Sequence, residues 1–237
     1  MRTDASARES TRPRADDQCP ICETLKPHEF LSLSDMPTQD GVVYTNRSDA
    51  LAAPKGDIRL AFCRHFHWIG NLSYRRDKVQ FTSYNFSQHY SPQFRAYLDE
   101  LIGRLCDTYP ITHGMILDIG CGNGYFLHRL CQYASSTGIG VDPSYHPAAP
   151  SPTQRERVVF IKDYFSPDKL DRKGDLICCR HVIDELALPR AFVSDLVQAM
   201  TPGQSSLLYL EMPNALKTFE AHLIWNIGYA KRSWFTS

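Results

Sequence analysis

A glycine-rich turn constrains the fold of this 237-residue chain more than any other feature of its sequence. An apolar run at residues 115–119 leads directly into the turn, and a helical pattern of apolar residues follows it. Glycine adopts the positive φ values of a tight turn at little cost, and it lets a backbone approach a ligand closely. The segment therefore predicts a buried strand, a sharp turn beside a ligand at the carboxyl end of a sheet, and then a helix. The turn reads Gly120-Cys121-Gly122-Asn123-Gly124.

Beyond this turn, short β-rich runs alternate with helical patterns, which is typical of a parallel sheet with crossover helices. Upstream, Ser91 and Pro92 suit the cap and the first position of a helix, and apolar residues follow them at spacings of three and four. We expect an α/β fold with a Rossmann-like, doubly wound parallel sheet. Its five expected strands cover residues 115–119, 138–141, 158–161, 175–179 and 206–211.

The spacing of the glycines distinguishes between kinds of nucleotide site. A dinucleotide-binding turn reads G-x-G-x-x-G, but Tyr125 takes the place of its third glycine here, and the sequence contains no G-x-x-x-x-G-K-S/T phosphate-binding pattern. Two carboxyl groups accompany the turn: Asp118 precedes it, and Asp142 ends the next expected strand. A carboxylate at the second position can accept hydrogen bonds from ribose hydroxyls.

This D-x-G-x-G-x-G arrangement, followed after about 20 residues by an acidic strand end, resembles motif I of the class I methyltransferases that depend on S-adenosylmethionine (SAM). The resemblance implies that the three glycines cradle the methionine and ribose portions of SAM and that Asp118 fixes the turn or the amino group. It further implies that Asp142 holds the ribose and that Asp163 contacts the adenine amino group. The implied cofactor-binding residues are Asp118, Gly120, Gly122, Gly124, Asp142 and Asp163.

Segments 159–165 and 174–185 resemble the third and fourth strands of this family, and segment 208–214 resembles the fifth strand as found in one branch of it. That branch couples an N-terminal zinc-binding module to the methyltransferase domain and includes sugar C-methyltransferases. Near its C-terminus this sequence departs from the branch, because Ala230 and Lys231 stand where the branch has a Glu-His pair whose histidine is implicated in C-methylation. The domain of the branch also has two more strands after the fifth, and this sequence ends before them. Three alternatives follow: the chain is a fragment, a natural minimal form, or one part of a complex in which self-association or a partner chain completes the sheet edge.

A metal-binding pattern opens the region before the sheet. Cys19-Pro-Ile-Cys22 places two thiolates at a spacing that lets both face one metal ion. The branch supplies two more cysteines further on, but this sequence has Cys63 alone, followed by His65 and His67. Either an imidazole completes a structural Cys₃His zinc site, with His67 favoured over His65, or the core alone holds the module together. The expected zinc ligands are Cys19, Cys22, Cys63 and His67.

Methyl transfer is an in-line displacement, so a protein must supply proximity, orientation and a base for the acceptor. We expect the acceptor pocket over the carboxyl ends of the fourth and fifth strands. His181 is the candidate base, because histidine ordinarily titrates at about pH 6.5; alternatively, it caps the next helix or orients the cofactor. Glu211 and Asn214 at the strand ends are candidate substrate residues. Tyr84 and Tyr90 in the linker are further candidates, although linker aromatics equally often hold two modules together.

Charge and composition limit the partners. The 26 basic and 26 acidic side chains cancel, which gives no electrostatic footprint for nucleic acid or an anionic membrane. We therefore expect a small-molecule acceptor, at a carbon or oxygen of a sugar or specialised metabolite, and no nucleic-acid or membrane partner. The alternative is a catalytically weak or partner-dependent cofactor-binding protein.

The chain is expected to have three parts. The first 17 residues mix acidic and basic side chains and lack the apolar core of a signal peptide, so we expect a disordered tail on a cytoplasmic protein. Residues 18–90 should form a small, loop-rich Cys/His module with its linker. Residues 91–237 should form the methyltransferase domain.

Overall fold

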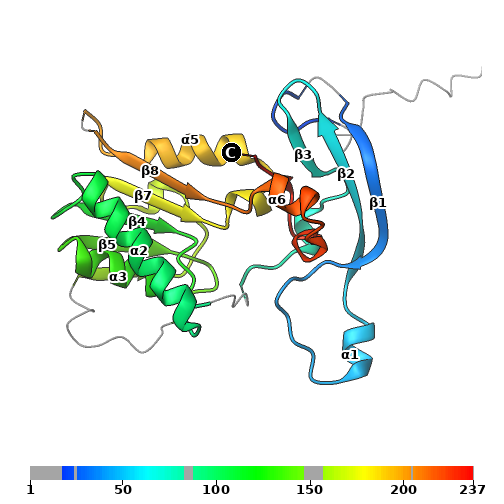
Figure 1. The fold of residues 1–237 in the computed structure, drawn as a ribbon, viewed down its shortest axis with the longest axis horizontal. Coiled ribbons are helices and arrows are strands. Elements are labelled where there is room, and N and C mark those ends of the chain that lie inside the picture. Colours follow the sequence, from blue (N-terminus) through cyan, green and yellow to red (C-terminus); the bar gives the residue numbers. More distant parts are fainter. Residues whose placement is uncertain (1–17, 24–25, 83–87, 147–156, 204, 237) are drawn as a thin grey trace, which may run out of the picture.

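The computed structural model describes residues 18–23, 26–82, 88–146, 157–203 and 205–236. Two β-sheets form its framework, one parallel and one antiparallel, and they lie next to each other in Figure 1. No helix in this described part of the chain is both long enough and apolar enough to cross a membrane.

The larger sheet contains five parallel strands in the order β6-β5-β4-β7-β8. They confirm the predicted strands to within one residue at each end, because each is a short apolar run next to a turn. The strand order reverses beside β4, and ligands bind at such a reversal in doubly wound folds. The strands are β4 (Met115–Ile119), β5 (Thr137–Val141), β6 (Val158–Ile161), β7 (Leu176–Arg180) and β8 (Leu207–Glu211).

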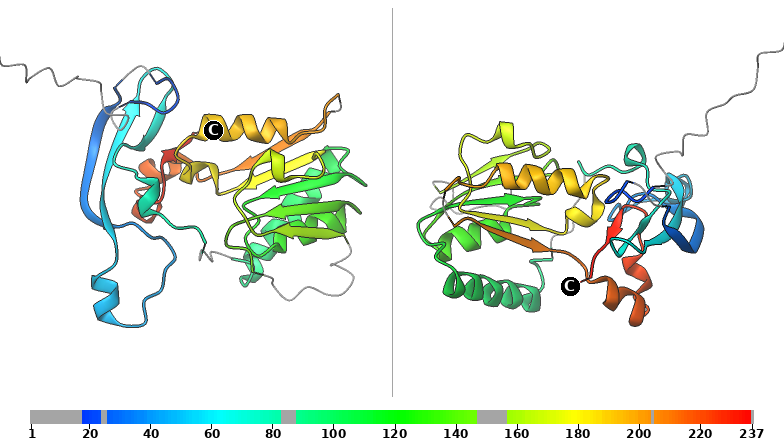
Figure 2. Two further views of the ribbon diagram at one scale, coloured as in Figure 1. Left: turned by 180° about the vertical axis from the view of Figure 1, so that it is seen from behind. Right: turned by 90° about the horizontal axis from the view of Figure 1, so that it is seen from above.

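Helices cover both faces of this sheet (Figure 2). On one face lie α2 (Pro92–Thr108) and α3 (Tyr125–Tyr133), whose apolar side chains pack with those of β4 and β7. On the other face lies α5 (Pro189–Gln198). The predicted cap of α2 is present, since Ser91 Oγ accepts a hydrogen bond from the backbone N–H of Phe94 at 3.3 Å.

The smaller sheet is antiparallel and joins the two ends of the described chain. Its order is β1-β2-β3-β9, and β9 (Ser233–Trp234) pairs with β3 (Trp68–Asn71). The indole N–H of Trp68 donates to Ser233 Oγ at 2.9 Å in a buried contact. The remaining strands are β1 (His28–Pro37) and β2 (Lys55–Cys63), with the short helix α1 (Arg47–Leu51) between them. The segment expected to be loop-rich therefore contains three strands, and the fourth strand of its sheet comes from about 165 residues later in the chain.

The polypeptide after β8 fills the space between the two sheets. It forms α6 (Ala215–Glu220) and the 3₁₀ turn η5 (Ile224–Asn226) before it enters β9 (Figure 1). Tyr229 lies in the core of the smaller sheet, where its ring packs so closely on Gly56 that a Cβ there would lie 2.4 Å from a ring carbon. Its hydroxyl donates to the carbonyl of Ser73 at 3.0 Å. These contacts fix the C-terminal segment beside the carboxyl ends of the parallel strands.

Candidate active site

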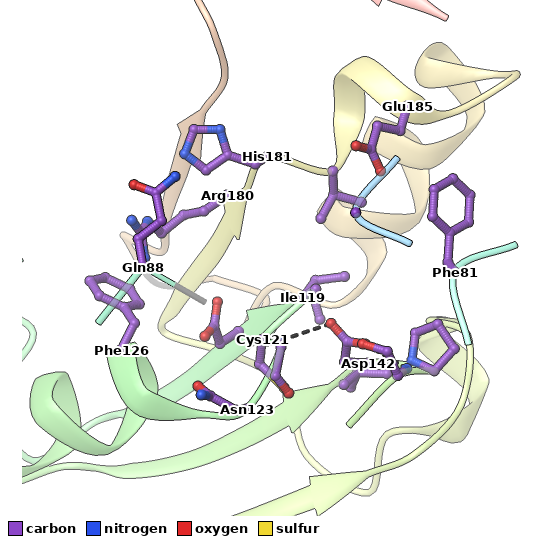
Figure 3. Close-up of a pocket in the computed structure, with 18 of the residues that line it drawn as sticks. Phe81, Gln88, Ile119, Cys121, Asn123, Phe126, Asp142, Arg180, His181 and Glu185 are labelled. Carbon is purple, nitrogen blue, oxygen red and sulfur yellow. Dashed lines mark hydrogen bonds between the residues drawn. The ribbon is translucent and has the colours of Figure 1, made fainter. Parts of the chain in front are cut away.

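A cavity of about 710 Å³ opens at the carboxyl ends of β4, β5 and β7, the edge at which doubly wound folds bind ligands. Its volume lies within the range of small-molecule sites, which is roughly 300–1,000 Å³. The glycine turn and the ends of these strands form one part of its wall (Figure 3). The segments that follow β1 and β3 of the smaller sheet, together with the C-terminal segment, form the other part, through Asp40, Gly41, Phe81, Pro213, Trp225, Asn226 and Lys231.

The three glycines of the turn adopt left-handed backbone conformations, with φ of 76° at Gly120, 56° at Gly122 and 80° at Gly124. A Cβ at Gly120 would lie 2.1 Å from the Val182 side chain, and one at Gly124 would lie 2.4 Å from the Phe160 ring. A Cβ at Gly122 would meet nothing within 4 Å, and Gly122 lines the cavity. The turn is therefore packed tightly on its protein side and leaves open the space in which a ligand can approach the backbone.

Asp142, at the end of β5, holds the glycine turn in place. One carboxylate oxygen accepts from the Gly122 N–H at 2.8 Å, the bond drawn in Figure 3. The other accepts from the backbone N–H and the hydroxyl of Ser144, at 2.7 and 2.6 Å. A carboxylate has about four lone-pair positions, so it keeps room for a ribose hydroxyl.

Asp118 is a buried carboxyl group in the cavity wall, with 2% of its surface exposed. Burial raises its pKa to about 7, and the neighbouring carboxylates of Asp142 and Glu211 act in the same direction. The charge of Arg180 opposes this rise. Near neutral pH the group therefore sits close to half ionisation, and a cationic ligand beside it would favour the ionised form.

Glu211, at the end of β8, brings several side chains together beside the cavity. Its carboxylate accepts hydrogen bonds from His181 Nε2 at 3.0 Å and from Arg180 Nε at 2.7 Å. The hydroxyls of Tyr209 and Tyr97 donate to it as well, at 3.1 and 3.3 Å. Burial opposes its ionisation, but the bonds from His181 and Arg180 outweigh burial and hold the pKa of Glu211 well below its usual range.

His181 lines the cavity directly after β7. Its backbone is left-handed, with φ of 55°, and its N–H donates to the carbonyl of Glu211 at 2.7 Å. The ring is half-exposed and is oriented by its bond to the Glu211 carboxylate. This carboxylate–imidazole pair has the form used for general acid–base chemistry, because the carboxylate orients the ring and stabilises the imidazolium.

Residues 88–235, which include the glycine turn and the strands around the cavity, match the model of a protein family described as a methyltransferase domain. The chain belongs to this family. It contains a SAM-dependent methyltransferase domain, and the glycine turn and Asp142 lie at the site where its nucleotide cofactor is expected.

Curated relatives match part of the methyltransferase chain. A tRNA U34 carboxymethyltransferase of Dichelobacter nodosus is 31% identical over 107 residues, which are 42% of this chain and 34% of the relative. A protein of the same name from Campylobacter curvus is 29% identical over 108 residues, covering 41% and 35% of the two chains. This chain thus spans about a third of the length of these relatives.

Two solved structures resemble the methyltransferase at low identity. The plantazolicin methyltransferase BpumL, in complex with a triazolic desmethylPZN analog and SAH, gives a TM-score of 0.41 at 18% identity, covering 57% of this chain and 53% of that one. The methyltransferase domain of bacterial CtHen1 gives a TM-score of 0.42 at 18% identity, covering 60% and 77%.

Asp163, Tyr90 and Asn214 were also predicted as site residues, and they lie outside the cavity wall. Asp163 is exposed; its carboxylate pairs with Lys169 at 2.5 Å, while the next two residues, Tyr164 and Phe165, line the cavity. Tyr90 is 73% exposed, and Tyr84 lies outside the described residues. Asn214 caps α6, since its side-chain oxygen accepts from the Leu216 N–H at 2.9 Å, in keeping with its position directly before that helix. The contacts proposed for these residues with a ligand remain predictions.

Asp40, which follows β1, lines the cavity without any signal in the sequence. Phe81 and His89 also line it, and both belong to the aromatic linker from which Tyr84 and Tyr90 were predicted as substrate residues. Lys231 forms an ion pair with the buried carboxylate of Asp184. The departure from the branch at Ala230 and Lys231 was the one signal that marked this region.

The three predicted cysteine ligands lie together. The sulfur atoms of Cys19, Cys22 and Cys63 are all within 4.8 Å of one another, and those of Cys22 and Cys63 are 3.9 Å apart. Two thiolates on one tetrahedral zinc ion, with Zn–S bonds of about 2.3 Å, lie roughly 3.8 Å apart. The three thiols therefore fit a zinc ion. Among the described residues no fourth ligand joins the group; the exposed ring of His67 stacks on Phe62 instead, with centroids 6.0 Å apart.

Proposed function

We propose that this protein transfers a methyl group from SAM to a small, hydroxyl-bearing acceptor that binds in the part of the cavity beside the smaller sheet. The observation that carries the proposal is the glycine turn, which Asp142 holds in place and which leaves open space at Gly122 in the wall of a cavity of about 710 Å³. Family membership supplies the reaction class.

The cofactor half of the cavity would hold SAM with residues of the parallel sheet. Gly120 and Gly122 bring the backbone close to the ligand, Asp142 offers acceptor positions to the ribose, and Tyr164 and Phe165 supply apolar surface at the adenine end. When bound, SAM supplies an electrophilic methyl group on a sulfonium centre. The protein contributes the site that orients it and excludes water from it.

The acceptor half of the cavity has a different character. Phe81 and Trp225 supply aromatic surface, and Asp40, Glu185 and Asn226 supply hydrogen-bonding groups. Burial raises the pKa of Asp40, while the charge of Lys231 opposes the rise. Aromatic faces with carboxylate and amide acceptors suit a ligand with several hydroxyl groups.

The charge balance of this wall favours a neutral acceptor. Lys231 is the one Lys or Arg side chain in the acceptor half of the described cavity wall, and its pairing with Asp184 already neutralises it. A polyanion such as RNA draws most of its affinity from cations that are available to phosphates. The cavity wall offers an acceptor hydrogen bonds and aromatic contact instead.

His181 is the residue that we propose as the base. Nε2 faces Glu211, which leaves Nδ1 to accept the proton of the acceptor as its oxygen or carbon attacks. Glu211 would stabilise the imidazolium that results. The proton then leaves to solvent from the half-exposed ring. The alternative is that His181 only orients the cofactor.

Turnover of labelled SAM tests the proposal. The protein, SAM carrying a labelled methyl group, and a panel of hydroxylated metabolites should yield a labelled small molecule, and the His181→Ala variant should yield far less. Binding of cofactor without turnover on any panel member would favour the alternative of a catalytically weak or partner-dependent cofactor-binding protein, which the replacement of the Glu-His pair at Ala230 and Lys231 supports.

An RNA acceptor is the second candidate, because the curated relatives are named tRNA U34 carboxymethyltransferases. Their similarity covers about two fifths of this chain, and the proposal of a small acceptor rests on the cavity wall. Transfer of label from SAM to acid-precipitable RNA, with total tRNA as acceptor, distinguishes the two. Label in RNA at a rate above that on every metabolite would overturn the small-molecule proposal.

We also propose a structural role for zinc. Cys19, Cys22 and Cys63 come from the N-terminal segment and the end of β2, so one ion would tie them together. His67 would have to leave Phe62 to complete the set. A zinc ion enclosed by protein ligands carries no activated water, so it would not take part in methyl transfer.

We further propose that the two parts of the chain share the cavity. Residues 18–90 form a module that contributes to the acceptor half of the cavity wall, and residues 91–237 supply most of the cofactor site.

A further inference from the structure

We propose that Arg180 binds the carboxylate of the amino-acid portion of the methyl donor. The inference rests on the proposed function and deepens it, because it assigns a residue to the part of the donor that neither the glycine turn nor Asp142 addresses.

Arg180 stands at the right place for this role. It is the last residue of β7, the strand that lies directly beside β4 in the sheet, and it lines the cavity together with Asp118. Figure 3 shows its side chain reaching from the end of β7 toward Phe126 and Gln88. Its side chain is 12% exposed, so the charged group sits inside the cavity wall.

The guanidinium group is held in one orientation. It lies over the ring of Phe126 at 4.3 Å from the ring centroid. Its Nε donates to Glu211 at 2.7 Å, and Nη2 lies 3.5 Å from the second oxygen of the same carboxylate. Burial acts against the charge, but the bond to Glu211 outweighs it and raises the pKa of Arg180 above its usual value. The group is therefore a fixed, permanent cation.

Glu211 occupies only one edge of this guanidinium. An arginine side chain has five N–H donors, and the contacts to Glu211 involve Nε and Nη2. Nη1 makes no hydrogen bond with any residue that the structure describes. The edge formed by the two terminal nitrogens thus keeps the paired donors that match a carboxylate.

Asp118 supplies the complementary charge. An α-amino acid group carries an ammonium and a carboxylate on neighbouring atoms, so a site for it needs an anion and a cation close together. Asp118, one residue before the end of β4, and Arg180, the last residue of β7, lie on adjacent strands, interact electrostatically and line the same cavity. If Arg180 served only to join β7 to β8 through Glu211, it would need neither a free donor edge nor a place in the cavity wall.

A carboxylate could also come from the transferred group, since the relatives are named carboxymethyltransferases. The chemistry that Arg180 recognises would then be the same. Its position beside Asp118 favours the amino-acid end, because only there does an ammonium accompany the carboxylate. Ligands that differ in the amino-acid carboxylate or in the carboxymethyl carboxylate distinguish these two sources.

The test compares three ligands by isothermal titration of the full chain. S-adenosylhomocysteine carries both the ammonium and the carboxylate. S-adenosyl-3-thiopropylamine keeps the ammonium and lacks only the carboxylate. The third ligand is the S-carboxymethyl analogue of SAM. The variants are Arg180→Met and the control Arg129→Met, which removes an arginine of α3 that pairs with Asp99 at the surface.

We expect the unaltered protein to prefer S-adenosylhomocysteine over the amine by at least about tenfold, as one charge-assisted pair predicts. In Arg180→Met this preference should fall to less than about threefold, and Arg129→Met should keep it. The double variant Arg180→Met/Glu211→Gln, which leaves no buried charge unpaired, should behave like Arg180→Met and unfold at the temperature of the unaltered protein.

Three results would overturn the inference. Folded Arg180→Met could keep the full preference for S-adenosylhomocysteine over the amine. It could bind both of these ligands more weakly by the same factor. It could also lose affinity for the carboxymethyl analogue alone. None of these affects the proposed function, provided that S-adenosylhomocysteine binds. A folded, unaltered protein that binds none of the three ligands would instead refute the proposed function itself.

Discussion

Replacing Asp118 by asparagine should remove a pH dependence from both folding and cofactor binding. The side chain is fully buried at the end of β4, and burial raises its pKa to about 7. Asparagine has the same shape and does not titrate. The difference between the two proteins therefore isolates this one carboxyl group from every other titrating residue.

The pH dependence of the free energy of unfolding follows from the difference between the pKa of Asp118 in the folded chain and in the unfolded chain. In the unfolded chain an aspartate titrates at about 3.9. Between roughly pH 4 and pH 7 the folded protein thus holds a proton that the unfolded chain has released. This contribution to stability is fully present below pH 4 and is lost as the pH rises through 7. A shift of about three pKa units corresponds to a loss on the order of 4 kcal/mol.

Urea unfolding of the ligand-free proteins at pH 5 and pH 8 measures this loss. The free energy of unfolding of Asp118→Asn, relative to the unaltered protein, should rise by on the order of 1–4 kcal/mol between the two values. S-adenosylhomocysteine should bind the unaltered protein more tightly at pH 8, where ionised Asp118 can receive its ammonium, and this dependence should weaken in the variant. If the difference in unfolding free energy between the two proteins were the same at both pH values, Asp118 would not have a raised pKa in the folded protein.

Three further predictions concern other parts of the site. His181→Ala should lower turnover by about 10²–10⁴-fold and leave the affinity for S-adenosylhomocysteine within about threefold; full turnover would remove His181 from the mechanism. Trp225→Ala should raise KM for the acceptor by about five- to thirtyfold with kcat unchanged, because its 75% exposed ring beside the cavity loses its contact with the acceptor. Ile224 is a similarly exposed neighbour outside the cavity wall, so Ile224→Ala should leave KM for the acceptor unchanged. If both substitutions raised KM equally, the acceptor would not bind beside Trp225. Elemental analysis should find close to one zinc per chain, and chelation or Cys63→Ser should lower Tm, whereas less than about a tenth of an equivalent in folded protein would exclude the filled site.

The sequence predicted the parts of the fold that depend on local pattern. The five parallel strands, the glycine turn and the capped helix α2 are each specified by neighbouring residues, such as Ser91 before Pro92 or Gly120 after Ile119. Asp118 and Asp142 could be placed in the site because both stand at strand ends, and parallel strands bring their carboxyl ends to one edge.

The smaller sheet could not be predicted in the same way. In β1 the alternation is short: Leu31 and Leu33 are half-buried and alternate with exposed serines, and the register then shifts between Leu33 and Met36, so the period-2 pattern is interrupted. Strand β9 has two residues and pairs with Ile69 and Gly70, far away in the sequence. No local signal identifies such a pairing, and Asp40 and Lys231 reach the cavity only because of it.

For the predicted metal ligands, spacing identified three side chains that lie together and left the fourth open. It selected Cys19, Cys22 and Cys63, whose sulfur atoms lie together, and it favoured His67, whose ring lies on Phe62. A histidine in a tight turn, here with φ of 51°, can point either way, and packing against an aromatic ring decides its direction. Asp163 is a similar case, since its pairing with Lys169 depends on the course of the chain six residues later.

Isothermal titration with S-adenosylhomocysteine tests the central claim, that this cavity holds SAM, most directly. If the cavity holds SAM, the titration should find one binding site per chain. Asp142→Ala should weaken binding by about 10- to 150-fold, since a charged hydrogen-bond partner of the turn and of the ribose is lost. Asp171→Ala, which changes an exposed aspartate, should bind like the unaltered protein. A well-folded protein that binds no S-adenosylhomocysteine, or one whose Asp142→Ala variant binds it with full affinity, would contradict the claim.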